Sequence, residues 1–267
     1  MELSLRVILC SIFADGSLST LESIRLDEVV GLKKWVLVSG CACILIVYIV
    51  AALCTNETAS ILAENKPILA KQTVIIDAGH GGEDGGATSC TGILESGMNL
   101  EIACRLRDML NLFGYHTIMT RTDDDAIHTE GSTIAQRKMS DLRNRVSLVN
   151  NTPNALLISI HQNYFTDSRY RGAQVFYANT ERSRCLAESI QKGFLSTINP
   201  GSKRMAKKAA NIYLMEKINC DGVLVECGFI SNNQEEAMLR DPEYQMKVCA
   251  VIAAETSVYL HDNPLLA

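Results

Sequence analysis

Four side chains that could form a catalytic metal site stand at or just beyond the ends of short apolar runs. They are His80 after residues 74–76, Glu95 in the glycine-rich segment that follows, His161 at the end of residues 155–160, and Glu226 at the end of residues 223–225. A catalytic zinc site requires three protein ligands, an open position for water and a carboxylate base nearby. The residue types therefore predict a zinc centre with two imidazoles and one carboxylate as ligands.

The three candidate ligands carry unequal support when each is taken alone. His80 is flanked by glycines, an open backbone in which a core histidine seldom sits, so a ligand role is favoured. His161 ends an apolar run and could equally be an ordinary core histidine. Glu95 could be a solvated loop residue, and its role depends on the glycine-rich segment returning to His80. Together the three residues give the His₂Glu set of a hydrolytic zinc centre.

Glu226 is the candidate general base. It lies between Val225 and Cys227 in an apolar run, where a carboxylate is costly unless it has a partner or a task. We expect it to take a proton from the attacking water and to deliver one to the leaving amine. The alternative is a cysteine hydrolase site formed by Cys227 and His161. Because neighbouring residues of a strand point to opposite faces, Glu226 and Cys227 cannot both line one site.

Two further polar residues end apolar runs. Asp77 is expected to bond local backbone or to support a metal ligand. Arg121 is expected either to be structural or to meet carboxylates of a substrate. His116, His128 and His261 lack such a setting and are expected to be ordinary histidines.

Alternating strand-like and helix-like patterns indicate an α/β fold with a mostly parallel sheet and helices on both faces. The expected strands are 74–76, 115–120, 155–160, 173–177, 211–215 and 223–225, and the expected helices are 99–113, 135–150, 181–198 and 242–260. Ligands of such sheets bind beyond the carboxyl ends of the strands. His80, His161 and Glu226 all lie there, which is independent support for a single site.

Composition and charge exclude some functions. The 267 residues are 47% hydrophobic and 21% charged, with a net charge of −5, an ordinary globular mixture. Without a long basic run, nucleic-acid binding has no electrostatic support, and we expect none. The ten cysteines contain no C-x-x-C pair, so a cysteine zinc site is not expected.

The N-terminal quarter predicts attachment to a membrane. No charged residue occurs between Trp35 and Asn56, and Lys33 and Lys34 precede this stretch. About 20 apolar residues span a bilayer, and preceding lysines favour a cytoplasmic N-terminus. We therefore expect a tail at 1–34, which could reflect a mis-assigned start, a transmembrane anchor or signal segment at 35–54, and a linker at 55–71. The catalytic domain at 72–262 would then lie outside the cytoplasm, with residues 35–54 in the cytoplasmic membrane.

Several motifs resemble the zinc-dependent N-acetylmuramoyl-L-alanine amidases of the amidase-3 type. They are VIIDAGHGGEDGGA, ESGMNLEIA, MTR, LLISIHQN, GAQVFY and GVLVECGFISN, spread over about residues 72 to 260. The segments RKMSDLRNRVSLVN, RGAQVFYA and NIYLMEKINCDGVLVECGFISN are most similar to the germination-specific, spore-cortex members. Gln162 departs from the small or apolar residue that often follows the second histidine of this family, which leaves substrate detail open.

The resemblance implies a mixed six-stranded sheet, zinc held by His80, Glu95 and His161, and Glu226 as the catalytic glutamate. It implies cleavage of the peptidoglycan amide between N-acetylmuramic acid and L-alanine of the stem peptide, in spore-cortex maturation with muramic-δ-lactam formation or in wall remodelling. No long inserted helix of an autoinhibitory kind separates Val175 from Val223, so the site is expected to be open or controlled by an activating protein partner. The alternatives are a zinc peptidase that cuts within the stem and a non-catalytic wall-binding module.

Overall fold

A six-stranded sheet forms the centre of the computed structural model, which describes residues 72–263. The strands are β1 (Thr73–Ala78), β2 (His116–Met119), β3 (Ala155–Asn163), β4 (Gln174–Tyr177), β5 (Lys207–Lys208) and β6 (Asp221–Phe229), in the order β2-β1-β3-β6-β4-β5. Every neighbouring pair is parallel except β4 with β6, which is antiparallel. The predicted mixed, mostly parallel six-stranded sheet is therefore confirmed.

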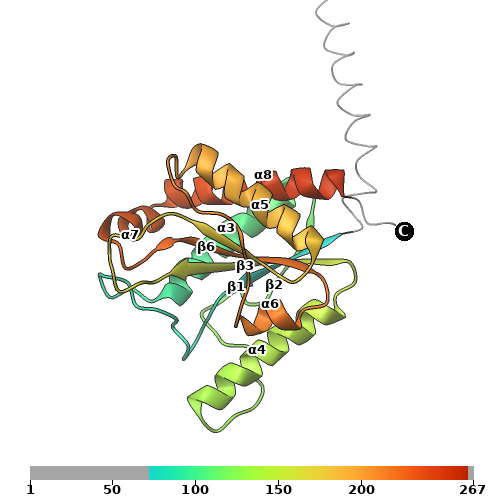
Figure 1. The fold of residues 1–267 in the computed structure, drawn as a ribbon. Coiled ribbons are helices and arrows are strands. Elements are labelled where there is room, and N and C mark those ends of the chain that lie inside the picture. Colours follow the sequence, from blue (N-terminus) through green and yellow to red (C-terminus); the bar gives the residue numbers. More distant parts are fainter. Residues whose placement is uncertain (1–71, 264–267) are drawn as a thin grey trace, which may run out of the picture. The chain divides into compact units, whose positions relative to one another are not determined.

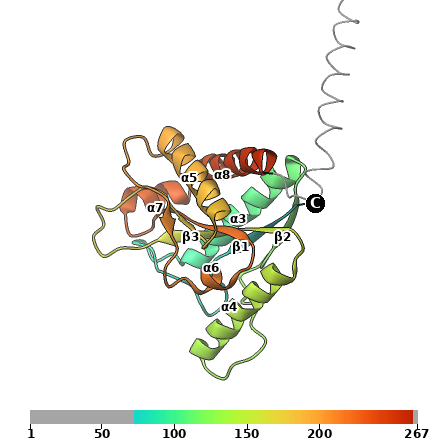
Figure 2. The same cartoon turned by 45° about the vertical axis from the view of Figure 1, so that its right-hand side comes forward.

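Helices cover both faces of the sheet (Figures 1 and 2). The helices are α3 (Glu95–Leu112), α4 (Ile134–Asn151), α5 (Glu181–Thr197), α6 (Tyr213–Lys217), α7 (Asn233–Leu239) and α8 (Pro242–Asp262). Helices α3, α5 and α8 pack on one face, and α4 and α6 pack on the other. The predicted covering of both faces by helices is confirmed.

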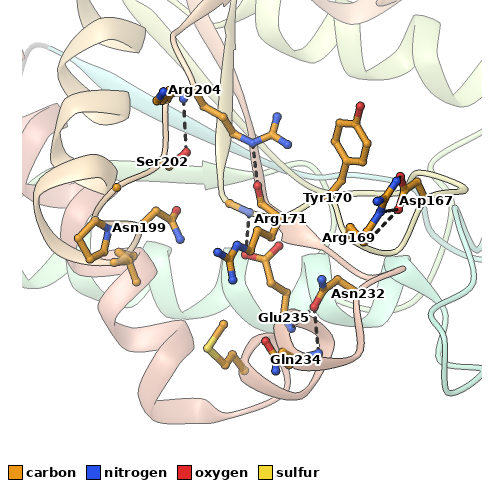
Figure 3. Close-up of a pocket in the computed structure, with 16 residues that line it drawn as sticks. Asp167, Arg169, Tyr170, Arg171, Asn199, Ser202, Arg204, Asn232, Gln234 and Glu235 are labelled. Atoms are coloured by element: carbon orange, nitrogen blue, oxygen red, sulfur yellow. Dashed lines mark hydrogen bonds and ion pairs between the residues drawn. The ribbon is translucent and has the colours of Figure 1, made fainter.

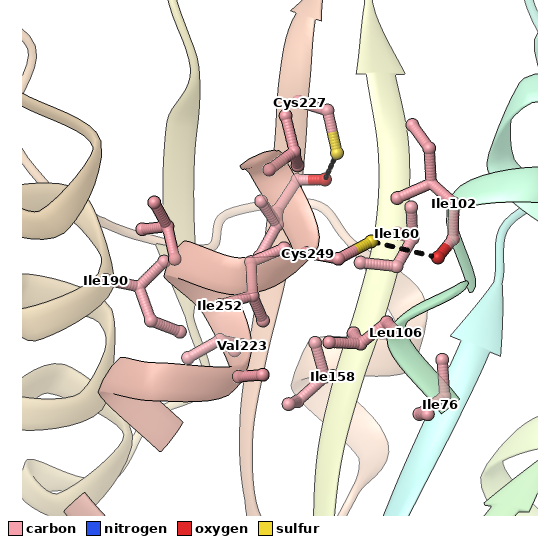
Figure 4. Close-up of a cluster of buried hydrophobic side chains, with 14 of the residues drawn as sticks. Ile76, Ile102, Leu106, Ile158, Ile160, Ile190, Val223, Cys227, Cys249 and Ile252 are labelled. Carbon is pink, nitrogen blue, oxygen red and sulfur yellow. Dashed lines mark hydrogen bonds between the residues drawn. The ribbon is translucent and has the colours of Figure 1, made fainter. Parts of the chain in front are cut away.

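Two apolar clusters hold the layers together. The larger one joins the inward side chains of β1, β3 and β6 to α3, α5 and α8, and includes Ile76, Ile158, Val223 and Ile252 (Figure 4). The smaller one lies on the α4 and α6 side, where Leu157 packs. Because β1, β3 and β6 are buried on both faces, they are apolar at successive positions, as is typical of central parallel strands. This is why the sequence pattern located them.

Side-chain caps define several helix starts. Thr133 and Gln136 form a reciprocal capping box at the start of α4. Asp241 caps α8, whose first residue is Pro242, a residue with the backbone angle that a helix start needs. The helices expected at 135–150, 181–198 and 242–260 are confirmed within one or two residues at each end.

Two expected elements were wrong. Residues 211–215 were expected to form a strand, but α6 occupies this region, and the sixth strand is the two-residue β5. Helix α3 begins at Glu95, four residues before the start of the helix expected at 99–113. The side chain of Asn99 donates to the backbone carbonyl of Gly79 at 3.1 Å and to Glu95. The short α7 had not been expected.

The transmembrane helix included in the predicted fold class is corrected. No helix within residues 72–263 is both long enough and apolar enough to cross a bilayer. Even α8, with 21 residues, carries Glu243, Lys247 and Glu255 along its length. The predicted span at 35–54, the tail at 1–34 and the linker at 55–71 lie outside the described residues. The structure supports the α/β domain of the predicted fold class and does not support its transmembrane helix.

Candidate metal centre

Three donor side chains from three different elements converge at the carboxyl edge of the sheet. His80 follows β1, Glu95 is the first residue of α3, and His161 lies near the end of β3. One ligand atom from each side chain lies within 4.8 Å of the other two. Glu95 stands between the imidazoles, with Oε2 3.4 Å from Nε2 of His80 and Oε1 3.0 Å from Nδ1 of His161. The structure thus brings together the three ligands predicted from the sequence into a group that could hold a metal ion.

The backbone around these side chains is shaped to let them meet. His80 has a φ of 62°, a left-handed conformation that non-glycine residues seldom adopt. A Cβ atom on Gly79 would lie 2.3 Å from the imidazole of His161, and one on Gly86 would lie 2.6 Å from Oε2 of Glu95. Both glycines therefore provide space that the histidine and the carboxylate occupy.

Asp84 orients the first imidazole. Its Oδ2 lies 2.9 Å from Nδ1 of His80 and 2.9 Å from Nζ of Lys138. Burial opposes ionisation of Asp84, but these two hydrogen bonds outweigh it and hold its pKa below the usual value. A carboxylate on the second ring nitrogen is a common support of metal-binding histidines. Asp84 is not among the residues predicted from the sequence, although an acid four positions after His80 is a signal that could have found it.

Glu95 is fixed by several hydrogen bonds. The backbone N–H of Ala87 donates to Oε2 at 3.0 Å, and that of Gln162 donates to Oε1 at 3.1 Å. The amide of Asn99 also donates to Oε1 at 3.1 Å. Burial would raise the pKa of Glu95, but the hydrogen bond and charge of His161, with the other contacts, lower it to about 2. The carboxylate is therefore ionised and held in one orientation.

His161 is held by its neighbours in the same way. Burial alone would lower its pKa, but the hydrogen bond to Glu95 and the charges of Glu226 and Glu95 raise it above the usual value. The two histidine rings meet edge to face, with centroids 5.0 Å apart. These donors are arranged around one point, as a divalent metal ion requires.

Glu226 lies beside the three donors. It is the Cα partner of His161 in the parallel pairing of β3 with β6. Burial raises the pKa of Glu226 to about 7, against the opposing charge of His161. Its Oε2 is buried, and among residues 72–263 no hydrogen-bond partner reaches it. An unpartnered buried carboxylate oxygen next to three convergent donors fits a site that a ligand completes.

Cys227 points away from this site. Its side chain is fully buried in the larger apolar cluster near Cys249 (Figure 4), and its Sγ lies 3.9 Å from the backbone oxygen of Val225. Burial raises the pKa of the thiol well above its usual value. A nucleophilic thiol needs the opposite shift and access to solvent, so the Cys227–His161 alternative is excluded.

Two buried arginines hold the backbone that carries His80. Arg121 donates to the carbonyl oxygens of Ala78, Gly79 and Ser96 at 2.8–3.0 Å. Of the two roles expected for Arg121, these contacts support the structural one and not binding of substrate carboxylates. Asp77 accepts from Arg145 at 2.5 Å and from the hydroxyl groups of Thr120 and Ser159. Although arginine is usually an exposed helix residue, Arg145 is buried.

Comparison with known proteins gives one consistent answer. Residues 74–255 match the amidase-3 family, described as N-acetylmuramoyl-L-alanine amidase. The germination-specific N-acetylmuramoyl-L-alanine amidase of Bacillus subtilis strain 168 is 37% identical over 190 residues, which are 69% of this chain and 78% of that relative.

Solved structures agree with this match. The CwlD amidase from Clostridioides difficile, determined in complex with the GerS lipoprotein, is 35% identical, with a TM-score of 0.69 over 72% of this chain and 100% of the other. An N-acetylmuramoyl-L-alanine amidase from Clostridium difficile 630 is 29% identical, with a TM-score of 0.64 over 73% of this chain and 99% of the other.

Proposed function

Because the chain belongs to the amidase-3 family and is an N-acetylmuramoyl-L-alanine amidase of the cell wall, we propose that it works with zinc held by His80, Glu95 and His161. We further propose Glu226 as its general base. The observation that carries this proposal is the unpartnered Oε2 of Glu226, which lies in register with His161 beside three convergent donors. We assign the activity to residues 72–262.

The donor set fits zinc better than other common metals. Two imidazoles and one carboxylate are the ligands of hydrolytic zinc centres, whereas magnesium and calcium prefer oxygen ligands throughout. When bound, zinc supplies Lewis acidity, which polarises a carbonyl group and makes water nucleophilic at neutral pH. The support of His80 by Asp84 also matches the carboxylate–histidine pairs of such sites.

Glu226 is placed to move protons. Its raised pKa of about 7 suits a group that must accept a proton from water and then donate it to the leaving amine near neutral pH. We propose that Oε2 accepts the proton, because no other residue of the described part of the chain bonds to that atom. Glu95 cannot share this role, since its oxygens already accept several hydrogen bonds.

The proposed substrate is the amide between N-acetylmuramic acid and L-alanine of the stem peptide. This bond lies in peptidoglycan, outside the cytoplasm, so the enzyme acts there. The similarity to a germination-specific amidase supports a role in the spore cortex, where loss of stem peptides would allow muramic-δ-lactam to form. The CwlD amidase was solved in complex with a lipoprotein, and we propose that this chain likewise binds a protein partner, which activates it.

Digestion of purified peptidoglycan by the full-length protein tests this function. We expect new N-terminal L-alanine on the released peptides, and loss of the reaction after treatment with a chelator. Zinc should restore it. Cleavage at a bond inside the stem peptide would instead identify a peptidase. Binding to peptidoglycan without release of any peptide would identify a wall-binding module, and activity that withstands complete removal of metal would contradict the zinc proposal.

A further inference from the structure

A large open pocket is formed by residues outside the candidate metal centre. It has a volume of about 1020 Å³ and is lined by Asp167 and residues 169–172 after β3, residues 198–204 after α5, and residues of α7 and its cap. Figure 3 shows Arg171 and Glu235 in its middle, with Tyr170 on one side and Arg204 on the other. None of the four predicted site residues lines it, so the mechanism above leaves this pocket without a role.

The pocket carries excess positive charge in a chain whose net charge is −5. Its wall includes two carboxylates, and both are already engaged. Asp167 pairs with Arg169 at 2.7 Å. Glu235 accepts the backbone N–H groups of Gly172 at 2.7 Å and Phe229 at 2.8 Å. Arg171, Lys203 and Arg204 form no salt bridge with any described residue, although the charge of Glu235 acts on Arg171 and Arg204. With Arg169, the wall therefore carries four cations against two carboxylates.

Arg204 is held in place while its charge stays available. Its Nε donates to the carbonyl oxygen of Arg171 at 2.9 Å, and its Nη1 donates to Oε1 of Gln174 at 3.0 Å. Its guanidinium lies over the ring of Phe229, 4.6 Å from the centroid. All three contacts are with uncharged groups. A guanidinium has five N–H donors, so most of them remain for a ligand.

Aromatic side chains form an apolar wall next to these cations. The rings of Phe165 and Tyr170 lie 4.5 Å apart, and that of Tyr170 lies 6.1 Å from Phe229. Phe165 and Tyr170 remain 46% and 48% exposed. A surface that combines fixed cations with exposed rings suits a ligand with both anionic and apolar parts.

The pocket begins close to the candidate general base. Gln174, which accepts the hydrogen bond from Arg204, is the Cα partner of Glu226 in the pairing of β4 with β6. Phe229, which supports Arg204, ends the strand that carries Glu226. A substrate held at Glu226 could therefore continue into the pocket.

We propose that this basic pocket binds the carboxylates of the stem peptide, an inference that rests on the proposed function. The scissile amide blocks the N-terminus of the stem, so the stem keeps a C-terminal carboxylate without an α-ammonium group to balance it. A stem peptide that extends from the scissile amide into the pocket would place its carboxylates near Arg171, Lys203 and Arg204. These side chains can form charge-assisted hydrogen bonds with carboxylates. The pocket thus selects substrates by the charge of the stem.

A binding experiment tests this inference independently of turnover. The probe is an N-acetylated stem peptide, used as the free acid and with every carboxylate amidated, and titrated calorimetrically into the full-length protein. We expect the acid to bind about tenfold or more tighter than the amide, the size of effect expected for one or two charge-assisted hydrogen bonds. In the double variant Arg171→Gln/Lys203→Gln, the acid should lose this advantage.

The matched control is Lys192→Gln/Lys247→Gln, which removes two exposed lysines from α5 and α8 and changes the net charge equally. It should bind both peptides as the unsubstituted protein does. Equal binding of acid and amide by the unsubstituted protein would overturn the inference, as would equal loss of affinity in the pocket variant and the control.

Kinetics separate this inference from the proposed function. On stem-bearing muropeptides, amidation of the carboxylates should lower kcat/KM of the unsubstituted enzyme about tenfold or more, and should add no further loss in the pocket variant. If the unsubstituted protein cleaves neither form, the proposed function fails, while the binding result still decides whether the pocket selects carboxylates.

Discussion

Nη2 of Arg145 donates to the backbone carbonyl oxygen of His80 at 2.7 Å, so a fully buried guanidinium on α4 fixes the residue that presents the first candidate ligand. The same guanidinium donates to Asp77 at 2.5 Å, to Ala78 at 2.8 Å and to Asp141 at 2.6 Å. His80 has a left-handed backbone with φ of 62°, which costs free energy unless the surroundings impose it. Arg145 supplies much of that constraint.

Replacing Arg145 with lysine should weaken metal binding while leaving a folded protein. Lysine keeps the positive charge but lacks the planar fork that reaches several acceptors at once. We expect zinc affinity to fall about 10–100-fold, the range seen when supporting groups behind metal ligands are lost. Competition with a chromogenic chelator measures the affinity, and circular dichroism monitors the fold.

The control for this variant is Arg143→Lys, two residues earlier on the exposed face of α4, where the side chain is 60% exposed and pairs with Glu130 at 3.6 Å. Such surface pairs contribute little. Unchanged zinc affinity in folded Arg145→Lys would show that Arg145 does not position His80.

Loss of either imidazole should abolish stoichiometric zinc binding. With His80→Ala or His161→Ala, two of the three donors remain, and the carboxylate of Glu95 loses one of its two imidazole neighbours. Metal content measured after dialysis should fall from about one zinc per chain to well below that, whereas the exposed His261→Ala keeps it. Full zinc content in both His80→Ala and His161→Ala would rule out the proposed centre.

The strands and their ends could be predicted because central parallel strands leave a strong local signal. Residues 74–76 and 223–225 are apolar throughout, and residues 155–160 are apolar except for Ser159; the polar residues that follow these runs mark the carboxyl edge of the sheet. Since parallel strands end at the same edge, the convergence of His80, His161 and Glu226 followed from that pattern.

Some features of the fold could not be predicted from the sequence because they depend on contacts between distant segments. Asparagine is a common helix cap, but the side chain of Asn99 donates a hydrogen bond to the carbonyl oxygen of Gly79, twenty residues earlier, and α3 starts at Glu95. Arg145 has the type of an outer helix residue, yet Asp77 and Asp141 pair with it in the interior. Residues 211–215 carry apolar side chains without a period that separates a strand from a short helix.

Acid should destabilise the protein through Asp77. Burial opposes its ionisation, but Arg145 and Ser159 outweigh burial and lower its pKa to about 2, against a usual value of 3.8. A carboxyl whose pKa is lower in the folded state stabilises the fold above pH 4, and this contribution is lost as the pH falls towards 2. The shift of about two units corresponds to about 2–3 kcal/mol of unfolding free energy.

Urea unfolding at pH 7 and at pH 2.5 measures this contribution. Asp77→Asn should be less stable than the unsubstituted protein at pH 7, and the difference should shrink at pH 2.5. The exposed Asp262→Asn removes an equal charge and should follow the unsubstituted protein at both values. A difference between Asp77→Asn and the unsubstituted protein that stays constant with pH would contradict the ionised role of Asp77.

Glu226→Gln should separate metal binding from proton transfer. Glutamine has nearly the shape of glutamate but cannot accept a proton from the attacking water, so amidase turnover should fall about 10²–10⁴-fold, the usual contribution of general acid–base groups. Zinc content should persist, because the three proposed ligands do not include Glu226.

The control variant Glu130→Gln makes the same chemical change at a side chain that is 72% exposed and should leave both turnover and zinc content unchanged. Loss of zinc from Glu226→Gln would make Glu226 a ligand, and near-normal turnover with zinc retained would make it structural. Only retained zinc together with a large fall in turnover agrees with a general base whose Oε2 is left free by every described neighbour.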